Sequence, residues 1–416
     1  MYNAVAPDNQ RHQFALSKEI LMPSKLPPLT LVTAEIAKKV VNLRRQIHAC
    51  PELGYHEFET QKLIIDELKN IGLTPKKAGG TGVVALIPGK NSAKDNRVLM
   101  LRSDMDALPL TEEVDVPFKS KNAGKMHACG HDAHIAVLIC AAKLLRDKPI
   151  DGTVKLIFQP AEEGGIGAQA MIDSGVLENP HVTAAFGIHV WSGIPLGRLE
   201  IAHGPCMAAV DEFDVIIKGR GGHAALPQHS IDPIYISSQV ISALQGIVSR
   251  TLDPIDTGVV TVGSIHGGTT FNIIPPEVKL QGTVRTFKEK TRKEIKKRFF
   301  NIVEGVTKSL GGKAEIDYRH MIPATTNNPQ MADLMWKAGE SVLGKKNVRE
   351  ARPVMGGEDM SLYLNKVPGC FGFLGAANPS VGTIYPHHHP KFWIDESALP
   401  YGVEILYRAS ERYFNQ

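Results

Sequence analysis

The chain has 416 residues, of which 43% are hydrophobic, and its 47 basic and 43 acidic residues give a formal net charge of +4. A chain of this length usually exceeds one hydrophobic core, so we expect two domains. The charge is too small and too evenly spread to indicate a nucleic-acid partner. The longest apolar run, Ile135–Ala142, is too short to cross a bilayer, so we expect no membrane association.

The cysteines and the N-terminal residues indicate a cytoplasmic protein. Five cysteines, scattered along the chain, do not resemble the even-numbered framework of a secreted disulfide protein. The first residues are polar and proline-rich and lack the continuous apolar segment of a signal peptide. We therefore expect a soluble protein in which residues 1–30 form an N-terminal extension of no evident function.

Helical and strand patterns alternate after this extension. Apolar spacing predicts helices at Ile36–Ile47 and Glu57–Leu68. Further along, short apolar runs alternate with helical stretches such as Asp132–Leu145. These runs are Val83–Ile87, Val98–Leu101, Val154–Phe158 and Ala184–Ile188. The alternation predicts an α/β catalytic domain, residues 31–207, with a mostly parallel sheet and helices on both faces.

A different order of elements begins near Asp211. The patterns predict a strand, a helix, two strands, a helix and a strand, at Phe213–Ile217, Pro233–Arg250, Val259–Ser264, Val278–Phe287, Lys290–Ser309 and Ala314–Arg319. This β-α-β-β-α-β order is that of a ferredoxin-like α+β unit. The α/β alternation of the first domain then resumes, with a helix, a strand and a closing helix predicted at Met331–Leu343, Cys370–Leu374 and Ala398–Phe414. We therefore expect residues 208–322 to form a lid inserted into a discontinuous catalytic domain that continues over residues 323–416.

Four polar segments lie where a predicted strand ends or a predicted helix begins. They are Arg102–Asp106, Glu162-Glu163, His189 and Cys129-Gly130-His131. Ligands of open α/β sheets bind beyond the carboxyl ends of the strands, so we expect these segments to converge. Thiolate, imidazole and carboxylate groups together suit zinc, manganese and other divalent transition metals. Convergence favours a metal site over the alternative, in which Cys129 is a buried small hydrophobe beside a helix-start histidine.

Glu162 and Glu163 are predicted to have different tasks. Consecutive side chains after a strand point to different sides, so one can bind metal while the other faces a bound water. A carboxylate beside a metal-bound water is the general-base arrangement of metallohydrolases. The alternative is a solvated acidic turn.

Further candidates lie in the predicted lid and near the C-terminus. One residue of the run His387-His388-His389 could complete a metal shell, or the run is an exposed polar loop. The segment Gly219–His223 is typical of a flexible loop, here with one histidine, and Asn272 lies near a strand end. Arg285 has the planar fork that binds a carboxylate through two hydrogen bonds, or it is a surface residue of the sheet.

Seven motifs occur in order along the chain. They are His48-x-x-Pro51-Glu52-Leu53-Gly54, Arg102–Leu108, Met126–His134, Gln159–Gly164, Gly187-Ile188-His189, Gly221–Ala225 and Asn272–Pro275. Together they resemble the amidohydrolase branch of the dinuclear metallo-aminoacylase and carboxypeptidase family, which includes hippurate hydrolases, auxin-conjugate hydrolases and N-acetyl-diaminopimelate deacetylases. Where the peptidase branches have a His-x-Asp metal motif, this chain has Asp104-Met105-Asp106, and it carries Cys129 in compensation.

The resemblance implies a dinuclear metal site with a separate general base. The implied ligands of two divalent ions are Cys129, His131, Glu163, His189 and His388. His388 is chosen among its neighbours because the family places its last ligand two residues before a proline, here Pro390. Glu162 would be the general base, and manganese or zinc the metal, with nickel or cobalt as alternatives.

The resemblance also implies roles for residues around the ligands. Asp106 would orient a ligand imidazole from behind. His223 would reach an active site, in one arrangement that of a partner subunit, and steady the tetrahedral oxyanion. Asn272 and Arg285 would hold the substrate. A homodimer or homotetramer formed through the lid is expected.

These features predict a metal-dependent amidohydrolase that cleaves the amide bond of N-acylated amino acids, such as N-acetyl or N-benzoyl derivatives. The first alternative is a metallo-carboxypeptidase or dipeptidase that acts on short peptides. A second alternative makes Cys129 a nucleophile with His131 or His134 as its base. A third is a binding or scaffold protein without enzymatic activity.

Overall fold

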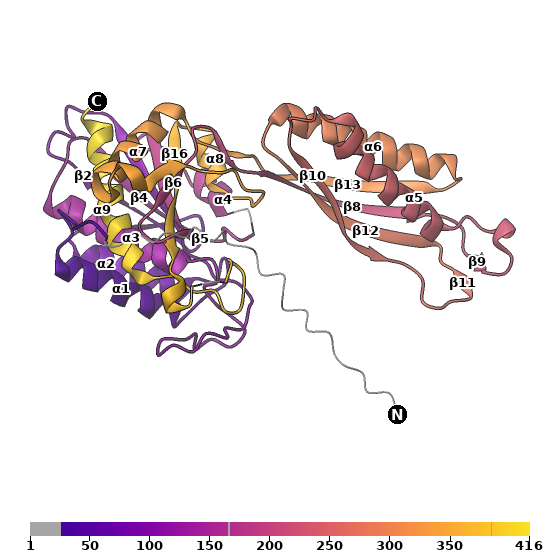
Figure 1. Cartoon of the computed structure of the whole chain (residues 1–416), viewed down its shortest axis with the longest axis horizontal. Helices are drawn as coiled ribbons and strands as arrows, with labels where there is room; N and C mark the ends of the chain where they lie inside the picture. The colour runs from indigo at the N-terminus through magenta and orange to yellow at the C-terminus, as the bar shows by residue number, and fades with distance from the viewer. Residues whose placement is uncertain (1–25, 165–166, 384) are drawn as a thin grey trace.

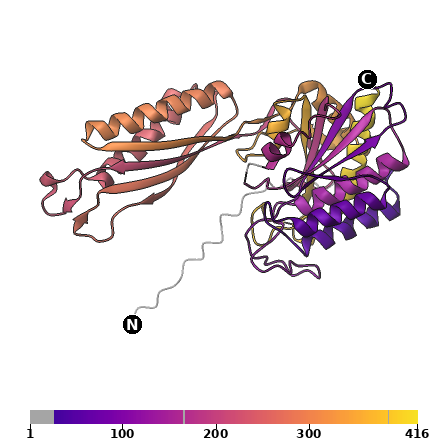
Figure 2. The same ribbon diagram turned by 180° about the vertical axis from the view of Figure 1, so that it is seen from behind.

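The computed structural model describes residues 26–164, 167–383 and 385–416. Residues 1–25 of the predicted extension therefore lie outside the described residues. The described chain forms two bodies joined by a pair of extended segments (Figures 1 and 2). None of its helices is long and apolar enough to cross a membrane.

The larger body is built on an eight-stranded sheet with the strand order β1-β2-β4-β3-β5-β16-β6-β15. The strands are β1 (Lys76–Ala78), β2 (Gly82–Pro88), β3 (Val98–Asp104), β4 (Thr153–Gln159), β5 (Ala184–Pro195), β6 (Leu199–Ile201), β15 (Val348–Glu350) and β16 (Gly369–Ala377). The four adjacent central strands β4, β3, β5 and β16 pair in parallel, whereas β1–β2, β2–β4 and β16–β6 are antiparallel. The predicted mostly parallel sheet is confirmed.

Helices cover both faces of this sheet, as predicted. One face carries α1 (Ala34–His48), α2 (Phe58–Asn70), α3 (His131–Asp147), α7 (Pro329–Leu343) and α9 (Leu399–Phe414), and the other carries α4 (Gly167–Asp173) and α8 (Met360–Leu364). Alternate residues of β3 feed the two cores, Leu99 and Leu101 the first, Val98 and Met100 the second. All seven residues of β3 are buried, as expected for a parallel strand covered on both sides.

The smaller body is the predicted ferredoxin-like unit, which we call the lid. Its antiparallel sheet has the order β10-β12-β8-β13, and two helices lie on one face of it (Figure 1). The elements are β8 (Ala209–Lys218), α5 (Pro233–Gly246), β10 (Gly258–His266), β12 (Glu277–Thr286), α6 (Glu289–Ser309) and β13 (Lys313–Ile322). Phe213 of β8 packs on Phe299 of α6 in a separate core, with ring centroids 4.5 Å apart. All six elements lie within the proposed boundaries 208–322.

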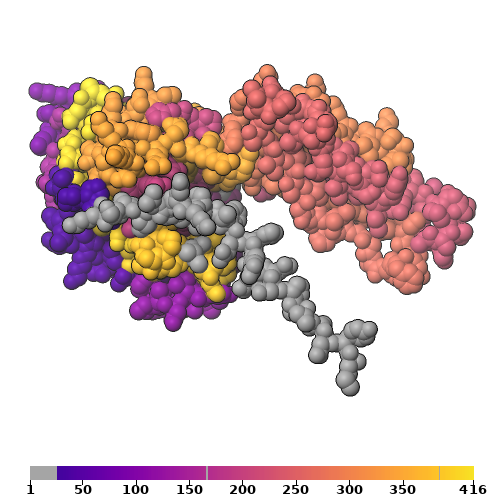
Figure 3. Space-filling model, viewed as in Figure 1, coloured from indigo at the N-terminus to yellow at the C-terminus, as the bar shows by residue number. Residues whose placement is uncertain are grey.

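Two short antiparallel pairs lie at opposite ends of the lid. The chain passes between the two bodies twice, and β7 (Pro205–Met207) and β14 (Thr325–Thr326) pair with each other where it does so. At the other end, β9 (Gly222–His223) pairs with β11 (Ile273–Ile274) and forms the lid tip. Figure 3 shows the lid extending away from the larger body in space-filling form. The tip therefore lies far from the sheet that the rest of the chain builds (Figure 1).

One predicted strand boundary is wrong in a way that concerns the site. The apolar run Ala184–Ile188 predicted a strand that ends before His189, whereas β5 continues to Pro195. The run ends at His189 because the pattern changes there from apolar to polar, but the backbone remains extended and paired with β16 as far as Pro195, with a register shift after Trp191. His189 is therefore a residue within a strand.

Candidate metal centre

Four polar segments meet at one edge of the large sheet. Asp104 and Gln159, the last residues of β3 and β4, lie opposite each other. Because Arg102 of β3 pairs with Gly187 of β5, His189 lies at the same level as Asp104. The first turn of α3 carries His131 and follows directly after Cys129. The predicted convergence at the carboxyl ends of the strands therefore occurs, although β5 runs past this level.

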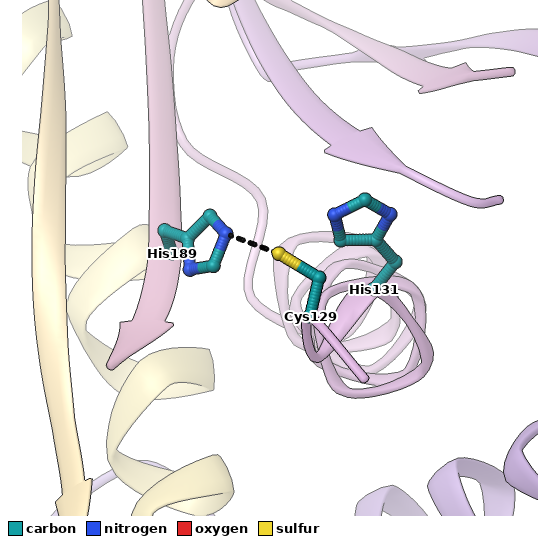
Figure 4. Close-up of side chains that lie close together, drawn as sticks. All are labelled: Cys129, His131 and His189. Carbon is teal, nitrogen blue, oxygen red and sulfur yellow. Dashed lines mark hydrogen bonds between the residues drawn. The ribbon is translucent and has the colours of Figure 1, made fainter. Parts of the chain in front are cut away.

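Cys129, His131 and His189 form a first group of potential metal ligands. One ligand atom from each lies within 4.8 Å of the others; His131 and His189 are buried, and Cys129 is partly exposed. The Sγ atom of Cys129 lies 3.5 Å from Nε2 of His189. Figure 4 shows His189 on its strand facing Cys129 and His131 at the start of the helix.

Gly130 permits this approach of Cys129 and His131 to β5. Its φ of 99° is in the left-handed region, where α3 begins. A Cβ atom at this position would lie 2.5 Å from Cγ2 of Val190. Only glycine fits both the backbone conformation and the space.

Backbone carbonyl groups determine which imidazole nitrogen faces this group. Nδ1 of His131 donates to the carbonyl oxygen of Asp106 at 2.9 Å, and Nδ1 of His189 donates to that of Val190 at 2.6 Å. Each Nε2 is then left with a lone pair, and Nε2 of His131 is buried without a hydrogen-bond partner among the described residues. This is the arrangement by which proteins orient imidazole ligands.

Cys129, Glu163 and His388 form a second group, whose ligand atoms also lie within 4.8 Å of one another. Nε2 of His388 lies 3.4 Å from Oε1 of Glu163. His388 has a left-handed φ of 63°, and its N–H donates to the carbonyl oxygen of Ala128 at 2.8 Å. Such a conformation is uncommon for a residue other than glycine and is typical of functional sites. Because Cys129 belongs to both groups, its sulfur is placed to serve two ions.

His387 and His389 differ from His388 in their surroundings. His387 is largely buried, with Nε2 donating to the carbonyl oxygen of Val190 at 3.1 Å, and burial lowers its pKa to about 3. His389 stacks on Tyr385, with ring centroids 4.6 Å apart. Of the three, only His388 faces Glu163 and Cys129.

Glu162 lies beside the ligands, in a turn that Asp106 holds. The Asp106 carboxylate accepts the N–H groups of Glu162 and Glu163 at 3.0 and 3.1 Å. The turn begins with a left-handed Ala161, φ 51°, whose N–H donates to the Glu57 carboxylate. Asp106 therefore touches His131 chiefly through its backbone carbonyl, while its carboxylate supports the glutamates, a division that the sequence did not predict.

Two further carboxylates, which the motifs did not single out, complete this wall of the site. Oxygen atoms of Glu162, Glu358 and Asp359 lie within 4.8 Å of one another. The buried Arg102 guanidinium contacts Asp104, Glu358 and Asp359 at 2.8, 3.0 and 2.7 Å. The Gly356-Gly357-Glu358-Asp359 run was the available sequence signal, because glycines next to paired acids permit close backbone approach.

Charge around the site is strongly negative. Burial, then Glu358 and Asp359, raises the pKa of Glu162 well above its usual value, and burial with Glu163 raises that of the Cys129 thiol. Burial lowers the pKa of His131, but Asp104, Cys129 and Asp106 together outweigh this effect, so the net shift is well upward. A divalent cation at this site would compete with protons for these ligands.

The residues present therefore fit divalent cations. Six carboxylates gather here, and the Arg102 guanidinium contacts three of them; the six are those of Asp104, Asp106, Glu162, Glu163, Glu358 and Asp359. Oε1 of Glu163, like Nε2 of His131, is buried without a hydrogen-bond partner in the described part of the chain. Sulfur, nitrogen and oxygen donors in one shell match borderline divalent transition metals.

The candidate residues of the lid do not share one place. His223 is exposed at the tip and pairs with Ile273, and Asn272 accepts the N–H of Ala224 through its carbonyl oxygen at 3.1 Å. Arg285 lies at the other end of the lid sheet, opposite Val210 at the start of β8. The half-buried Arg285 keeps one guanidinium nitrogen, Nη1, without a partner among the described residues. Within one chain, β9, which contains His223, and β11, which follows Asn272, lie at the end of the lid away from the larger body (Figure 1), whereas Arg285 lies opposite Val210, near the junction.

The hydrogen bonds of His134 argue against Cys129 as a nucleophile. Nε2 of His134 accepts the N–H of Val190 at 2.9 Å and its Nδ1 meets Asp104 at 2.6 Å, so His134 has no free nitrogen for Cys129. The His131 nitrogen nearest the thiol instead belongs to the ligand group. An α/β fold with a mixed donor set at its carboxyl edge and an acid beside it defines a hydrolytic metal site rather than a thiol one.

Comparison with known proteins places this fold and site in a family. The model of peptidase family M20/M25/M40 matches residues 100–412. The chain is 42% identical over 381 residues to IAA-amino acid hydrolase ILR1-like 4 of Arabidopsis thaliana, covering 90% of this chain and 85% of that one. It is 41% identical over 375 residues to thermostable carboxypeptidase 1 of Saccharolobus solfataricus, covering 89% and 94%.

A solved structure agrees with these sequence matches. The YxeP protein of Bacillus subtilis, described as a dinuclear metal-binding peptidase of the M20 family, superposes with a TM-score of 0.80 at 33% identity and covers 92% of this chain and 99% of that chain. The protein belongs to peptidase family M20/M25/M40 and is a hydrolase. The resemblance seen in the sequence is confirmed.

Proposed function

We propose that this hydrolase is a dinuclear metal-dependent amidohydrolase that cleaves the amide bond of N-acylated amino acids. The observation that carries the proposal is the Glu162 carboxylate beside two ligand groups that share Cys129. The similarity to an IAA-amino acid hydrolase supports an amino-acid conjugate as the substrate. The presence of Asp104-Met105-Asp106 where the peptidase branches have His-x-Asp, with Cys129 in compensation, supports the amidohydrolase branch.

Cys129, His131 and His189 would hold one divalent ion, and Cys129, Glu163 and His388 the other. When bound, such ions acidify water and polarise a carbonyl oxygen. We propose manganese or zinc as the metal, with nickel or cobalt as alternatives, because all four accept mixed sulfur, nitrogen and oxygen shells.

Glu162 would move the proton. It takes a proton from the water that attacks the amide carbonyl carbon, and it later gives that proton to the leaving nitrogen. Burial and the neighbouring acids Glu358 and Asp359 raise the pKa of Glu162. Arg102 holds the carboxylates of Glu358 and Asp359, which lie next to Glu162. The Asp106 carboxylate accepts the backbone N–H of Glu162.

The test is Glu162→Gln, which keeps the size of the side chain and removes the base. The variant and the wild type should both bind two metal equivalents, and the variant should lose roughly 10²–10⁴-fold in turnover. Glu113→Gln is the matched control, because its carboxylate is exposed and lies outside both ligand groups. A Glu162→Gln enzyme with near-normal turnover would overturn the assignment.

A metallo-carboxypeptidase or dipeptidase is the second candidate, and it is favoured by the 41% identity to a thermostable carboxypeptidase. A substrate panel separates the two functions. N-acetyl, N-benzoyl and indole-acetyl amino acids should be cleaved in the presence of added manganese, and dipeptides should be poor substrates. Cleavage of peptides together with failure on every acylated amino acid would establish the second candidate.

We further propose that the lid forms a homodimer, alone or within a homotetramer, in which His223 and Asn272 serve the partner's site. His223 would steady the oxyanion, while Arg285 would bind the substrate carboxylate from its own chain. Exposed apolar side chains cluster in the lid, among them Leu226, Ile234, Tyr235, Ile265, Phe271 and Ile273, and Phe271 is 96% exposed. Patches of this kind are typical of interfaces.

Mixing two inactive variants tests this arrangement. Glu162→Gln and His223→Ala subunits, unfolded and refolded together, should regain activity, because a mixed dimer contains one site with both residues intact. Recovery to no more than the sum of the separate variants would mean that His223 does not act across subunits.

A further inference from the structure

The peptide groups of Val190 lie where β5 loses a neighbour. The β3–β5 ladder ends at Arg102 opposite Gly187, and β3 itself ends at Asp104. Val190 lies beyond that point and is 1% exposed. Val190 is paired with Leu374 of β16 on one side of β5, so a buried N–H and C=O on the side that β3 has left must find other hydrogen-bond partners.

Three histidines provide those partners. The N–H of Val190 donates to Nε2 of His134 at 2.9 Å. Its carbonyl oxygen accepts from Nδ1 of His189 at 2.6 Å and from Nε2 of His387 at 3.1 Å. These imidazoles come from α3, from β5 and from the segment that carries His388, so one residue of β5 joins three parts of the site.

The hydrogen bonds show that His134 and His387 are not free to bind metal. Because Nε2 of His134 accepts from Val190, its proton is on Nδ1, which donates to Oδ1 of Asp104 at 2.6 Å. Nε2 of His387 donates to Val190, and its Nδ1 accepts from the Ser192 hydroxyl group at 3.4 Å. Both nitrogens of each ring are therefore used.

Distances alone would suggest that His134 is a metal ligand. Its ligand atom lies within 4.8 Å of those of Asp104 and His131, so the three could be taken for a further metal group. The bond to Val190 decides against that reading, because it occupies the only lone pair that His134 could offer.

We propose that His134 and His387 are positioning residues that act through Val190. Together they hold His189 with Nε2 toward Cys129, and they attach the segment that carries His388 to β5. The ring packing agrees, with centroids 4.4 Å apart for His134–His189 and 5.3 Å apart for His189–His387. The inference rests on the proposed dinuclear function, since it concerns the placement of the proposed ligands.

The two residues should affect the two ions differently. His134 supports β5 next to His189, a ligand of the first group. His387 precedes His388, whose side chain is 55% exposed and belongs to the second group. Loss of His387 should therefore weaken the second ion more than the first, and loss of His134 should do the reverse.

The experiment is a metal titration of the full-length apoenzyme with manganese or zinc. Leucine removes both hydrogen bonds of each ring, whereas glutamine can restore both, since its amide group donates and accepts. The variants are His134→Leu, His134→Gln, His387→Leu and His387→Gln. His181→Leu is the control, because this exposed histidine of the larger body pairs with Glu178 at 3.1 Å and lies outside both ligand groups. Circular dichroism and thermal unfolding verify folding of each variant.

Each leucine variant should bind its affected ion roughly 10–100-fold more weakly, with both ions still bound at saturating metal. The glutamine variants should recover most of that loss, a rescue that a merely space-filling role would not show. Wild-type affinity in the leucine variants would overturn the inference. So would a His134→Gln protein that binds one ion at saturation, because His134 would then be a ligand. If the leucine variants do not fold, the glutamine variants decide. Metal affinity in these variants as low as in a variant that lacks a ligand would also overturn the positioning inference.

A His189→Leu variant separates this inference from the proposed function. It should lose one ion at any metal concentration. If it keeps both, or if the wild type binds none, the proposed metal site fails. If it loses one while His134 and His387 variants bind normally, only the positioning inference fails.

Discussion

Replacing Gly130 by alanine places a methyl group between the proposed metal ligands and β5. Gly130 has φ 99° and ψ 13°, and the added Cβ atom would lie 2.5 Å from Cγ2 of Val190. The left-handed backbone costs about 1–2 kcal/mol for a residue other than glycine. The steric conflict in a packed core adds about 1–3 kcal/mol. We therefore expect a destabilisation of about 2–5 kcal/mol, a large part of a typical total of about 5–15 kcal/mol.

Urea denaturation followed by tryptophan fluorescence measures this loss in the correct domain. Trp191, Trp336 and Trp393 all lie outside the lid, so their emission reports the larger body. Gly382→Ala is the matched control: Gly382 has φ 85° and ψ 11°, and among the described residues no atom other than those of its chain neighbours lies within 4 Å of its added Cβ atom. The Gly382→Ala variant should show only the destabilisation that comes from the left-handed backbone.

A second substitution isolates the contact. Val190→Ala removes the atom that the new methyl group meets, so it should destabilise the Gly130→Ala protein less than it destabilises the wild type. Equal losses for Gly130→Ala and Gly382→Ala, with additive effects of Val190→Ala, would refute the steric argument.

Four other outcomes follow from the contacts described. Cys129→Ala should abolish binding of both ions, since Cys129 belongs to both ligand groups, and elemental analysis that finds two ions would contradict this. Arg102→Leu leaves buried carboxylates without a counter-charge and should cost about 3–5 kcal/mol in urea denaturation; a loss below 1 kcal/mol would argue against their ionisation. Glu404→Ala removes the carboxylate that accepts N–H groups of residues 30–32, so limited proteolysis should cut near residue 30 faster than in the wild type. Hydrogen bonding to Glu350 raises the pKa of His203 above 6.5, so its stabilising contribution is complete below pH 6.5 and disappears as the pH rises through the folded-state pKa; a His203→Gln difference of less than about 1 kcal/mol, present only at the acidic end, is expected.

Local patterns were sufficient for most of the fold. The apolar runs and helical spacings predicted the long elements of both bodies because each of them buries a regular face, as β8 does with its strict alternation of buried and half-buried residues. The patterns did not reveal β1, β6 and β15, which have three residues each and too few positions for a period. The end of β5 was misplaced because His189 interrupts the apolar run without ending the strand.

The candidate site divides in a similar way. Cys129, His131, Glu163, His189 and His388 stand in motifs whose residue types indicate metal ligands, and the fold brings all five together. Glu358 and Asp359 went unnoticed because they lie more than 250 residues after Arg102, the group that holds them. No periodicity connects positions that far apart.

By itself, the sequence determined the types of ligand atom, their order along the chain and the inserted architecture of the lid, because these depend on composition and on short-range periodicity. Only the tertiary structure decided which nitrogen of each histidine is free. That choice depends on hydrogen bonds such as those to Val190, made by His134 and His387 from 56 and 197 positions away. It also decided that the lid tip with His223 faces away from its own site, since the direction of a lid depends on how two bodies join and not on the residues within either one.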